Sequence, residues 1–315
     1  RSSKAKFRHL KAISKVINVK NTLPILEGVL LNVEGSKLAD TASDMETGVE
    51  KSLEVNEAEG SGKFAGNAKN LLDPLKELPE QPLTFDINDG NLEIFIYFHN
   101  GKYNFIGQSG DDYPQPKELK ESAVGLSIDP QTLFTGINRT LFASADDELR
   151  PVMNGVYFDI TPDDLTFVAS DGHKLVRYKT LEAKGNERAS FSLPKKPSNF
   201  IQAIFPKKSE TAEFRFDENN AHIKMSGYTM TCRFIEGRYP NYNSVIPQNN
   251  TNKVVLNRQS FLNAIKRVSV FSNQASNLIK LQLSDRNIVV SAQDIDFSTA
   301  AEETIPCEYS GTPMN

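Results

Sequence analysis

Three side chains with the chemistry of a hydrolytic site lie close together in the middle of the chain. Ser170, Asp171 and His173 offer a hydroxyl nucleophile, a carboxylate and an imidazole base. A catalytic triad needs its base within hydrogen-bond reach of the nucleophile, and side chains three residues apart after a strand seldom converge in this way. The sequence also lacks the Gly-x-Ser-x-Gly elbow of many hydrolases. The segment therefore favours a strand-ending turn or the wall of a binding site over an active site.

Residues that could bind a metal are few and scattered. The neighbouring acids Asp111 and Asp112 precede a Tyr-Pro pair, a context typical of a turn. The four histidines and the two cysteines, Cys232 and Cys307, lie far apart in the sequence, so a structural zinc site is not expected. We therefore predict neither a metal nor another cofactor.

Length and composition indicate a globular protein with more than one domain. A chain of 315 residues with 38% hydrophobic and 24% charged residues can bury a core without disulfides. No apolar run is long enough for a transmembrane helix, and no apolar segment follows the basic N-terminus as it would in a secretory signal. Two cysteines make no disulfide framework, so we expect a reduced, cytoplasmic protein without membrane contact.

Basic residues are concentrated in three acid-free runs. The net charge of −4, from 36 basic and 40 acidic residues, argues by itself against nucleic acid. The runs 1–26, 194–208 and 237–284 nevertheless hold 17 basic residues and no acidic one within 89 residues, which leaves 19 basic and 40 acidic residues for the other 226. Each run alone could be a solvated face, but together they predict one cationic surface on an anionic protein.

The chain contains an internal repeat. The segments 28–44 and 155–171 each read as an apolar strand, a turn and a second strand that ends in Ala-Ser-Asp. A third copy ends in Ala-Gln-Asp, so Asp44, Asp171 and Asp294 lie 127 and 123 residues apart. After Ala-Ser-Asp, the first copy continues with Met-Glu-Thr-Gly and the second with Gly-His-Lys-Leu. This difference indicates that the fold needs the shared part and a binding site needs the variable part.

Each hairpin follows a segment with the spacing of an amphipathic helix. Apolar residues from Phe7 to Ile17 step by three or four, and 132–141 and 261–270 take the same place in the later copies. Ser260 is predicted to cap the third of these helices. A second helix follows the hairpin in the first two copies. In the first copy, Pro74 should shorten or kink this second helix.

The repeat unit is about 125 residues long, with helix and strands occurring twice in each unit. We predict domains at 1–117, 118–247 and 248–315, the last of them partial. Their pattern predicts an α+β fold of repeated domains with antiparallel sheets and helices on one side. Roughly 55–60 residues of a full third unit are missing, so we expect the sequence to be a piece of a longer chain.

The chain resembles the bacterial sliding-clamp family, the beta subunits of the replicative DNA polymerase III. The resemblance spans essentially all 315 residues. Five segments carry it, in order, on the threefold repeat: Ile17–Leu26, Thr41–Thr47, Gly107–Pro114, Val168–Leu175 and Glu236–Pro247.

The resemblance implies a non-catalytic processivity factor. In the family, a head-to-tail homodimer closes six domains into a ring around double-stranded DNA, with helices lining the hole and sheets outside. The ring is placed by an ATP-driven clamp loader and tethers the replicative polymerase, and repair proteins, through short linear peptides. The family's third domain continues beyond the equivalent of this chain's end and finishes in an apolar tail beside the peptide groove. We therefore expect the third domain here to be truncated.

The resemblance and the helix positions together predict the residues that contact DNA. Lys20 takes the place of a DNA-contacting basic residue of the family, and the others are assigned by helix placement alone, with about half expected to face the DNA phosphates. These other candidates are Arg8, Lys11, Lys15, Arg139, Lys195, Lys196, Arg258, Lys266 and Arg267.

The resemblance also implies a partner-peptide groove between the second and third domains, and a dimer interface. The groove positions combine apolar side chains for Leu or Phe anchors with polar ones for the peptide ends. They are Met153, Ser170, Gly172, His173, Lys174, Leu175, Pro240, Ser244 and Val245. Val270 and Phe271, at the end of the third helix, are expected at the subunit interface, although Phe271 could instead be a core residue. The alternative function is a nucleic-acid-binding repeat protein that forms no ring.

Overall fold

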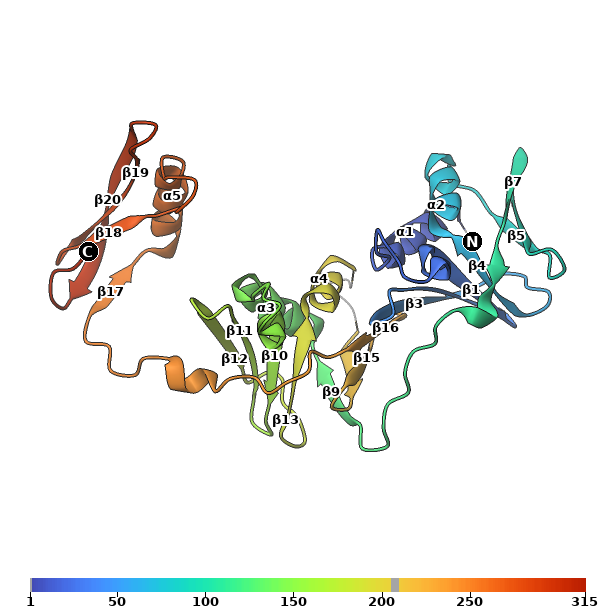
Figure 1. Cartoon of the computed structure of the whole chain (residues 1–315), viewed down its shortest axis with the longest axis horizontal. Helices are drawn as coiled ribbons and strands as arrows, with labels where there is room; N and C mark the ends of the chain where they lie inside the picture. Colours follow the sequence, from blue (N-terminus) through green and yellow to red (C-terminus); the bar gives the residue numbers. More distant parts are fainter. Residues whose placement is uncertain (1, 205–209) are drawn as a thin grey trace. The chain divides into compact units, whose positions relative to one another are not determined.

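The computed structural model describes residues 2–204 and 210–315, which form two compact units, Arg1–Pro240 and Asn241–Asn315 (Figure 1). The first unit contains two copies of the repeat, and the second unit contains the third copy. Lys207 and Lys208, from the second basic run, lie outside the described residues. Within the described part of the chain, no helix is long and apolar enough to span a membrane.

The three copies share the order of helix, hairpin and further strands. The first contains α1 (Ser3–Ser14), β1 (Gly28–Glu34), β2 (Lys37–Ser43), β3 (Thr47–Glu54), β4 (Gly62–Asn67), α2 (Ala68–Glu77), β5 (Thr84–Ile87), β6 (Glu93–Phe98), β7 (Gly101–Ile106) and β8 (Gln108–Ser109). The second contains β9 (Val124–Ile128), α3 (Pro130–Thr140), β10 (Gly155–Ile160), β11 (Leu165–Ser170), β12 (Leu175–Thr180), β13 (Ala189–Pro194), α4 (Lys195–Ile204), β14 (Ala212–Phe216), β15 (Asn220–Met225) and β16 (Tyr228–Arg233). The third contains β17 (Lys253–Leu256), α5 (Arg258–Ser269), β18 (Lys280–Leu283), β19 (Asn287–Asp294) and β20 (Thr299–Ser310).

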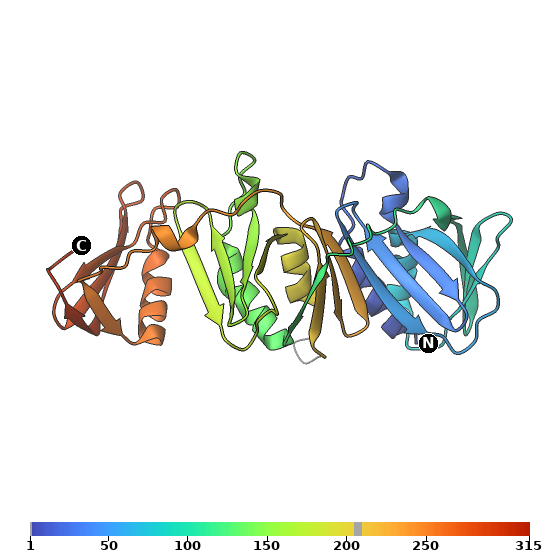
Figure 2. The same ribbon diagram turned by 90° about the horizontal axis from the view of Figure 1, so that it is seen from below.

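One antiparallel sheet runs through both repeats of the first unit. Its nine strands have the order β8-β4-β1-β2-β3-β16-β15-β14-β9, so β3 of the first repeat pairs directly with β16 of the second. Two smaller sheets, β5-β6-β7 and β12-β11-β10-β13, complete the unit. The helices α1 to α4 lie on one side of these sheets (Figures 1 and 2). In the second unit, the sheet has the order β17-β20-β19-β18 and packs against α5.

Apolar side chains on one face of each helix hold it to the sheet. Leu10 and Ile13 of α1 are fully buried, as are Leu133 and Ile137 of α3. The periodicity predicted these contacts, because residues three and four apart share one face of a helix. The burial of each such side chain contributes roughly 1.5–3 kcal/mol.

Side chains at the helix starts fix where the helices begin. The side chain of Asn67 accepts hydrogen bonds from the N–H groups of Lys69 and Asn70 at the start of α2. The predicted cap at Ser260 is wrong: Asn257 caps α5 by accepting from the Ser260 N–H at 2.9 Å, so Ser260 lies inside the helix. Pro74 lies within α2, which nevertheless continues to Glu77.

Candidate nucleic-acid interface and the 170–175 loop

Four exposed basic side chains form a stripe along α1. They are spaced by four, three and four residues, which places them on one helix face, opposite the buried Leu10. Within the described residues, none of them has an acidic side chain at ion-pair distance. This basic stripe consists of Lys4, Arg8, Lys11 and Lys15. Sequence reasoning missed Lys4, although the same periodicity could have found it.

Three further predicted residues are also exposed without an acidic partner in the described part of the chain. Lys20 lies in the loop after α1, and Arg258 and Lys266 lie at the start and in the last turn of α5. Such side chains remain available for phosphate groups, whose contacts position a protein on nucleic acid without reading its sequence.

The other four predicted residues are held by the protein itself. Lys195 forms an ion pair with Asp146 at 2.8 Å, and Lys196 forms one with Asp44. Arg139 lies over the Tyr178 ring at 5.0 Å from its centroid. These contacts reduce the availability of each cation to an external anion.

Arg267 is held most completely among these four. Its guanidinium forms a two-pronged pair with Glu303, with nitrogen–oxygen distances of 2.8–3.0 Å. The hydrogen bonds with Arg267 lower the pKa of the Glu303 carboxyl. Only part of the predicted set is thus free to meet phosphates.

The segment 170–175, which we call the 170–175 loop, is a tight hairpin tip between β11 and β12. The Asp171 carboxylate accepts hydrogen bonds from the N–H groups of His173 and Lys174, both at 2.9 Å, and forms an ion pair with the Lys174 ammonium. The Lys174 ammonium and these N–H groups hold the pKa of Asp171 well below its ordinary range. The buried Ser170 hydroxyl donates to the Lys174 carbonyl and accepts from the Gly172 N–H.

This geometry is that of a turn and not of a catalytic triad. The Ser170 hydroxyl and the Asp171 carboxylate are both engaged by their own hairpin tip, and in the described structure no hydrogen bond joins the His173 imidazole to Ser170. Among the described residues, no group of three or more His, Cys, Asp and Glu side chains is arranged to hold a metal.

The same aspartate closes the equivalent tip in all three repeats. Asp44 accepts from the N–H groups of the second and third residues after it, at 3.0 and 2.7 Å. Asp294 does the same at 3.0 and 3.4 Å. The recurring aspartate therefore serves the fold, and the residues that follow it are free to differ between repeats.

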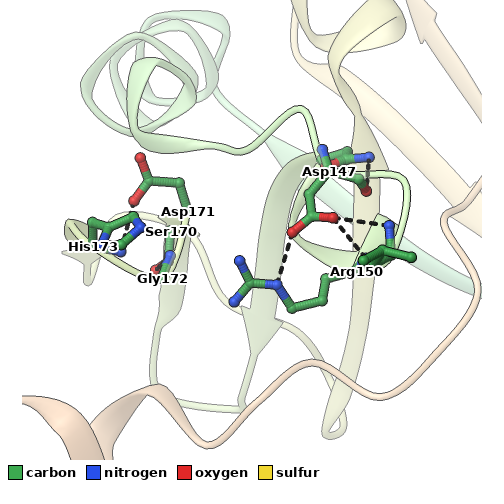
Figure 3. A network of polar contacts seen from close by, with 8 residues as sticks. Asp147, Arg150, Ser170, Asp171, Gly172 and His173 are labelled. Carbon is green, nitrogen blue, oxygen red and sulfur yellow. Dashed lines mark hydrogen bonds and ion pairs between the residues drawn. The ribbon is translucent and has the colours of Figure 1, made fainter.

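Arg150 lies against the 170–175 loop and was missed by sequence reasoning. Gly172 has a φ of +89°, and a Cβ added there would approach Nη1 of Arg150 to 2.9 Å. Asp147 holds the arginine through an Nε–Oδ2 hydrogen bond of 2.8 Å, and the guanidinium points toward the loop (Figure 3). The bond from Arg150 and the N–H of Leu149 lower the pKa of Asp147. No sequence motif marks Arg150. It directly precedes the short helical turn Pro151–Met153, and its position beside the loop is seen only in the folded chain.

The predicted apolar groove residues are accessible to different degrees. Leu175 and Met153 are half-buried, and Pro240 is exposed at the end of the first unit, after Tyr239, whose ring stacks on Tyr157 at 4.4 Å. In the second unit, Ser244 is exposed and the Val245 side chain is 66% exposed. Val245 is therefore no core residue.

Val270 and Phe271 are exposed at the end of α5. Their exposed fractions are 71% and 41%. Phe271 is thus outside the core of the second unit, which is formed around Val268 and Val290. Large apolar side chains at such exposure often mark a contact surface.

Sequence comparisons match consecutive parts of one protein family along the chain. Models of the DNA polymerase III beta subunit match with the N-terminal domain at residues 4–117, the central domain at 127–241 and the C-terminal domain at 243–315. The beta sliding clamp of Synechococcus elongatus is 28% identical over 316 residues, which cover 97% of this chain and 82% of the relative. The beta sliding clamp of Pseudomonas aeruginosa is 27% identical over 309 residues, which cover 98% of this chain and 83% of the relative.

Solved structures agree with these matches. The Pseudomonas aeruginosa DNA polymerase sliding clamp, crystallised with a ligand, superposes with a TM-score of 0.91 at 25% identity, covering 100% of this chain and 85% of that one. A sliding clamp from Bartonella birtlesii bound to griselimycin superposes with a TM-score of 0.89 at 25% identity. The match covers 99% of this chain and 84% of that one. The repeated domains with helices on one side of antiparallel sheets are thus those of a DNA sliding clamp.

Within that class, the chain belongs to the family of DNA polymerase III beta subunits, the beta sliding clamps. Its function is that of the non-catalytic processivity factor of the polymerase.

Proposed function

We propose that two copies of the clamp associate head to tail into a closed ring of six repeats that encircles double-stranded DNA and binds partner peptides. The observation that carries the proposal is the basic stripe on α1. Among the described residues, none of its four cations forms an ion pair with an acidic side chain, and acidic residues predominate elsewhere in the chain. A surface of this kind attracts phosphates and is independent of base sequence.

The DNA part of the proposal predicts a change in salt dependence. Each phosphate contact contributes a slope of about −0.9 to log K against log salt. Replacing Lys11, Lys15 and Lys20 with Gln should therefore weaken DNA binding and flatten the slope by up to about 3.

The matched control neutralises three exposed lysines on strands, Lys37, Lys63 and Lys224. These side chains lie on β2, β4 and β15, so this variant should keep the slope of the parent protein. Equal slopes for both triple variants would remove the α1 surface from the DNA interface.

The 170–175 loop and its neighbours support the peptide part of the proposal. Leu175 and Met153 offer apolar contact surface, Gly172 is exposed and has no side chain to cover its backbone, and Arg150 supplies a positioned cation for a peptide carboxylate. Val245, which is 66% exposed in the second unit, is a further apolar residue that the resemblance assigns to the peptide groove.

Binding of a fluorescent peptide with adjacent Leu and Phe side chains tests this site. Leu175→Asp or Val245→Asp should weaken binding by about 10- to 150-fold, since one buried apolar side chain contributes roughly 1.5–3 kcal/mol. Leu181→Asp is the control, because Leu181 is 75% exposed just beyond β12. Unchanged affinity in folded Leu175 and Val245 variants would exclude the site. Clamp loaders, polymerases and repair proteins are the partners that we expect to carry such peptides.

A further inference from the structure

Two basic residues open helix α4 of the second repeat, at a helix end where cations are unfavourable. Lys195 and Lys196 are the first two residues of α4. The N-terminal end of a helix carries a partial positive charge, so a cation there needs a compensating partner. Lys195 is paired with Asp146, whose side chain is 89% exposed, and Lys196 is paired with Asp44, whose side chain is 8% exposed. Of these two pairs, Lys196–Asp44 is the better shielded from solvent.

The Lys196 ammonium joins the two repeats of the first unit. Asp44 lies at the β2–β3 tip of the first repeat, where its Oδ1 accepts from two N–H groups of the tip and its Oδ2 accepts from Lys196. The carboxylate is thus fixed by its own tip and fixes the lysine in turn. A second hydrogen bond from the Nζ of Lys196 reaches Oδ1 of Asn18 at 2.7 Å, across 178 residues of chain.

Asn18 lies in the loop 15–23, which follows α1 and carries Lys20. Both side chains are exposed. Within the loop, Nδ2 of Asn21 donates to the Asn18 carbonyl at 2.8 Å. The hydrogen bonds at Asn18 therefore tie the loop to itself through Asn21 and to the second repeat through Lys196.

We propose that Lys196 is a positioning residue for DNA binding, which holds Asn18 so that Lys20, two residues further along, is ordered before it meets a phosphate. The inference rests on the proposed contact of Lys20 with DNA and adds the residue that supports this contact. Ordering a loop on binding costs free energy, and a loop that is held in advance avoids this cost. Two of the three ammonium N–H groups of Lys196 are engaged within the protein, so Lys196 acts through Lys20 and not through a phosphate contact of its own.

The substitution Asn18→Ala separates positioning from charge. It removes the acceptor of one Lys196 hydrogen bond but no cation, and it leaves the Lys196–Asp44 pair in place. We expect Asn18→Ala and Lys196→Gln each to weaken binding of a short fluorescent DNA duplex, measured by anisotropy, by about 2- to 10-fold, as for the loss of one hydrogen bond. The slope of log K against log salt should stay close to that of the parent, whereas loss of a direct phosphate contact would flatten it by about 0.9.

A double-mutant cycle with Lys20→Gln tests whether Lys196 acts through Lys20. In the Lys20→Gln background, Asn18→Ala and Lys196→Gln should each change the affinity for the duplex by less than about 2-fold, because the residue that they position is already absent. The matched control is Lys195→Gln, which removes the neighbouring cation of the same helix turn and whose partner Asp146 lies outside the loop. Its effect should be the same with and without Lys20.

Equal effects of Asn18→Ala and Lys196→Gln in both backgrounds would overturn the inference. A slope flattened by about 0.9 in Lys196→Gln, with no effect of Asn18→Ala, would also overturn it and make Lys196 a direct phosphate contact. Unchanged binding in Lys20→Gln alone would remove the residue through which Lys196 acts. The proposed function is tested separately by replacing Lys11 and Lys15, which weakens binding if the α1 surface contacts DNA, whatever the loop contributes.

Discussion

A buried ion pair beneath α1 provides a quantitative test of how the first repeat is held together. The Nζ of Lys6 lies 2.5 Å from Oδ2 of Asp40, and the two side chains are 7% and 0% exposed. Oδ1 of Asp40 has no hydrogen-bond partner among the described residues. The equivalent positions in the second repeat are the fully buried Leu133 and Phe167. The first repeat therefore places two charges where the second places hydrocarbon.

Removing one partner should cost far more than removing both. Lys6→Met leaves the Asp40 carboxylate buried without its counter-ion, and breaking a buried pair in this way costs about 3–5 kcal/mol of unfolding free energy. Lys6→Met with Asp40→Leu should lie within about 1 kcal/mol of the parent or above it, because an apolar pair of similar volume needs no desolvation of charge.

The pH dependence has a defined sign. Burial raises the pKa of Asp40 from its ordinary 3.8, although Lys6 opposes the shift. The folded state then binds the proton more tightly than the unfolded state. The resulting contribution to stability is fully present below pH 3.8 and is lost as pH rises through the folded-state pKa. Without Lys6 the pKa of Asp40 rises further. The loss of unfolding free energy in Lys6→Met, relative to the parent, should therefore shrink as pH falls.

Denaturant unfolding followed by circular dichroism, with hydrogen exchange of the α1 amides as a local probe, measures both effects. Because a multi-domain chain need not unfold in one step, the α1 amides identify the transition that belongs to the first repeat. A loss below about 1 kcal/mol for Lys6→Met at pH 7, or a double variant as unstable as the single one, would refute this reasoning.

Three further outcomes are expected. Gly136→Ala should destabilise the second repeat by about 1–3 kcal/mol, because a Cβ there would lie 2.4 Å from the Phe167 ring, whereas Gly125→Ala, whose nearest contact is at 3.8 Å, should change the thermal midpoint little. Burial raises the pKa of the Cys232 thiol to about 12, so a thiol reagent at pH 8 should modify it only after unfolding, and rapid modification of the native protein would contradict its burial. Lys196→Gln should alter the salt slope of DNA binding less than Lys11→Gln, since Lys196 is already paired; a larger effect of Lys196 would reverse that assignment.

Local patterns predicted much of the fold. The hairpins β1–β2 and β10–β11 follow from apolar runs separated by turn residues, and the spacing of Asp44 and Asp171 identified the repeat, since a tight tip needs a side chain that accepts backbone N–H groups. The strand β3 was not assigned from the sequence. Its mixed polar and apolar residues do not predict a strand by themselves. The strand depends on pairing with β16, which lies about 180 residues away along the chain.

The site was harder to predict because charge pairing is a property of the folded chain. The sequence placed Lys6 and Lys196 in basic runs, but Lys6 is buried with Asp40, and Lys196 meets Asp44 across 152 residues of chain. Arg150 has no motif of its own and is positioned by Asp147 and the turn that follows. Periodicity identified the basic face of α1, whereas only the folded structure identifies which cations remain free.

Retention on circular and linear DNA tests the ring most directly. The clamp is loaded by a clamp loader onto a nicked circular duplex, half of the sample is then cut once with a restriction enzyme, and bound protein is separated by gel filtration at moderate salt. A closed ring predicts that the clamp stays with the circle and is lost from the cut molecule by sliding off its ends. Equal retention on both DNAs, decreasing equally as salt rises, would contradict encirclement and favour a nucleic-acid-binding repeat protein that forms no ring.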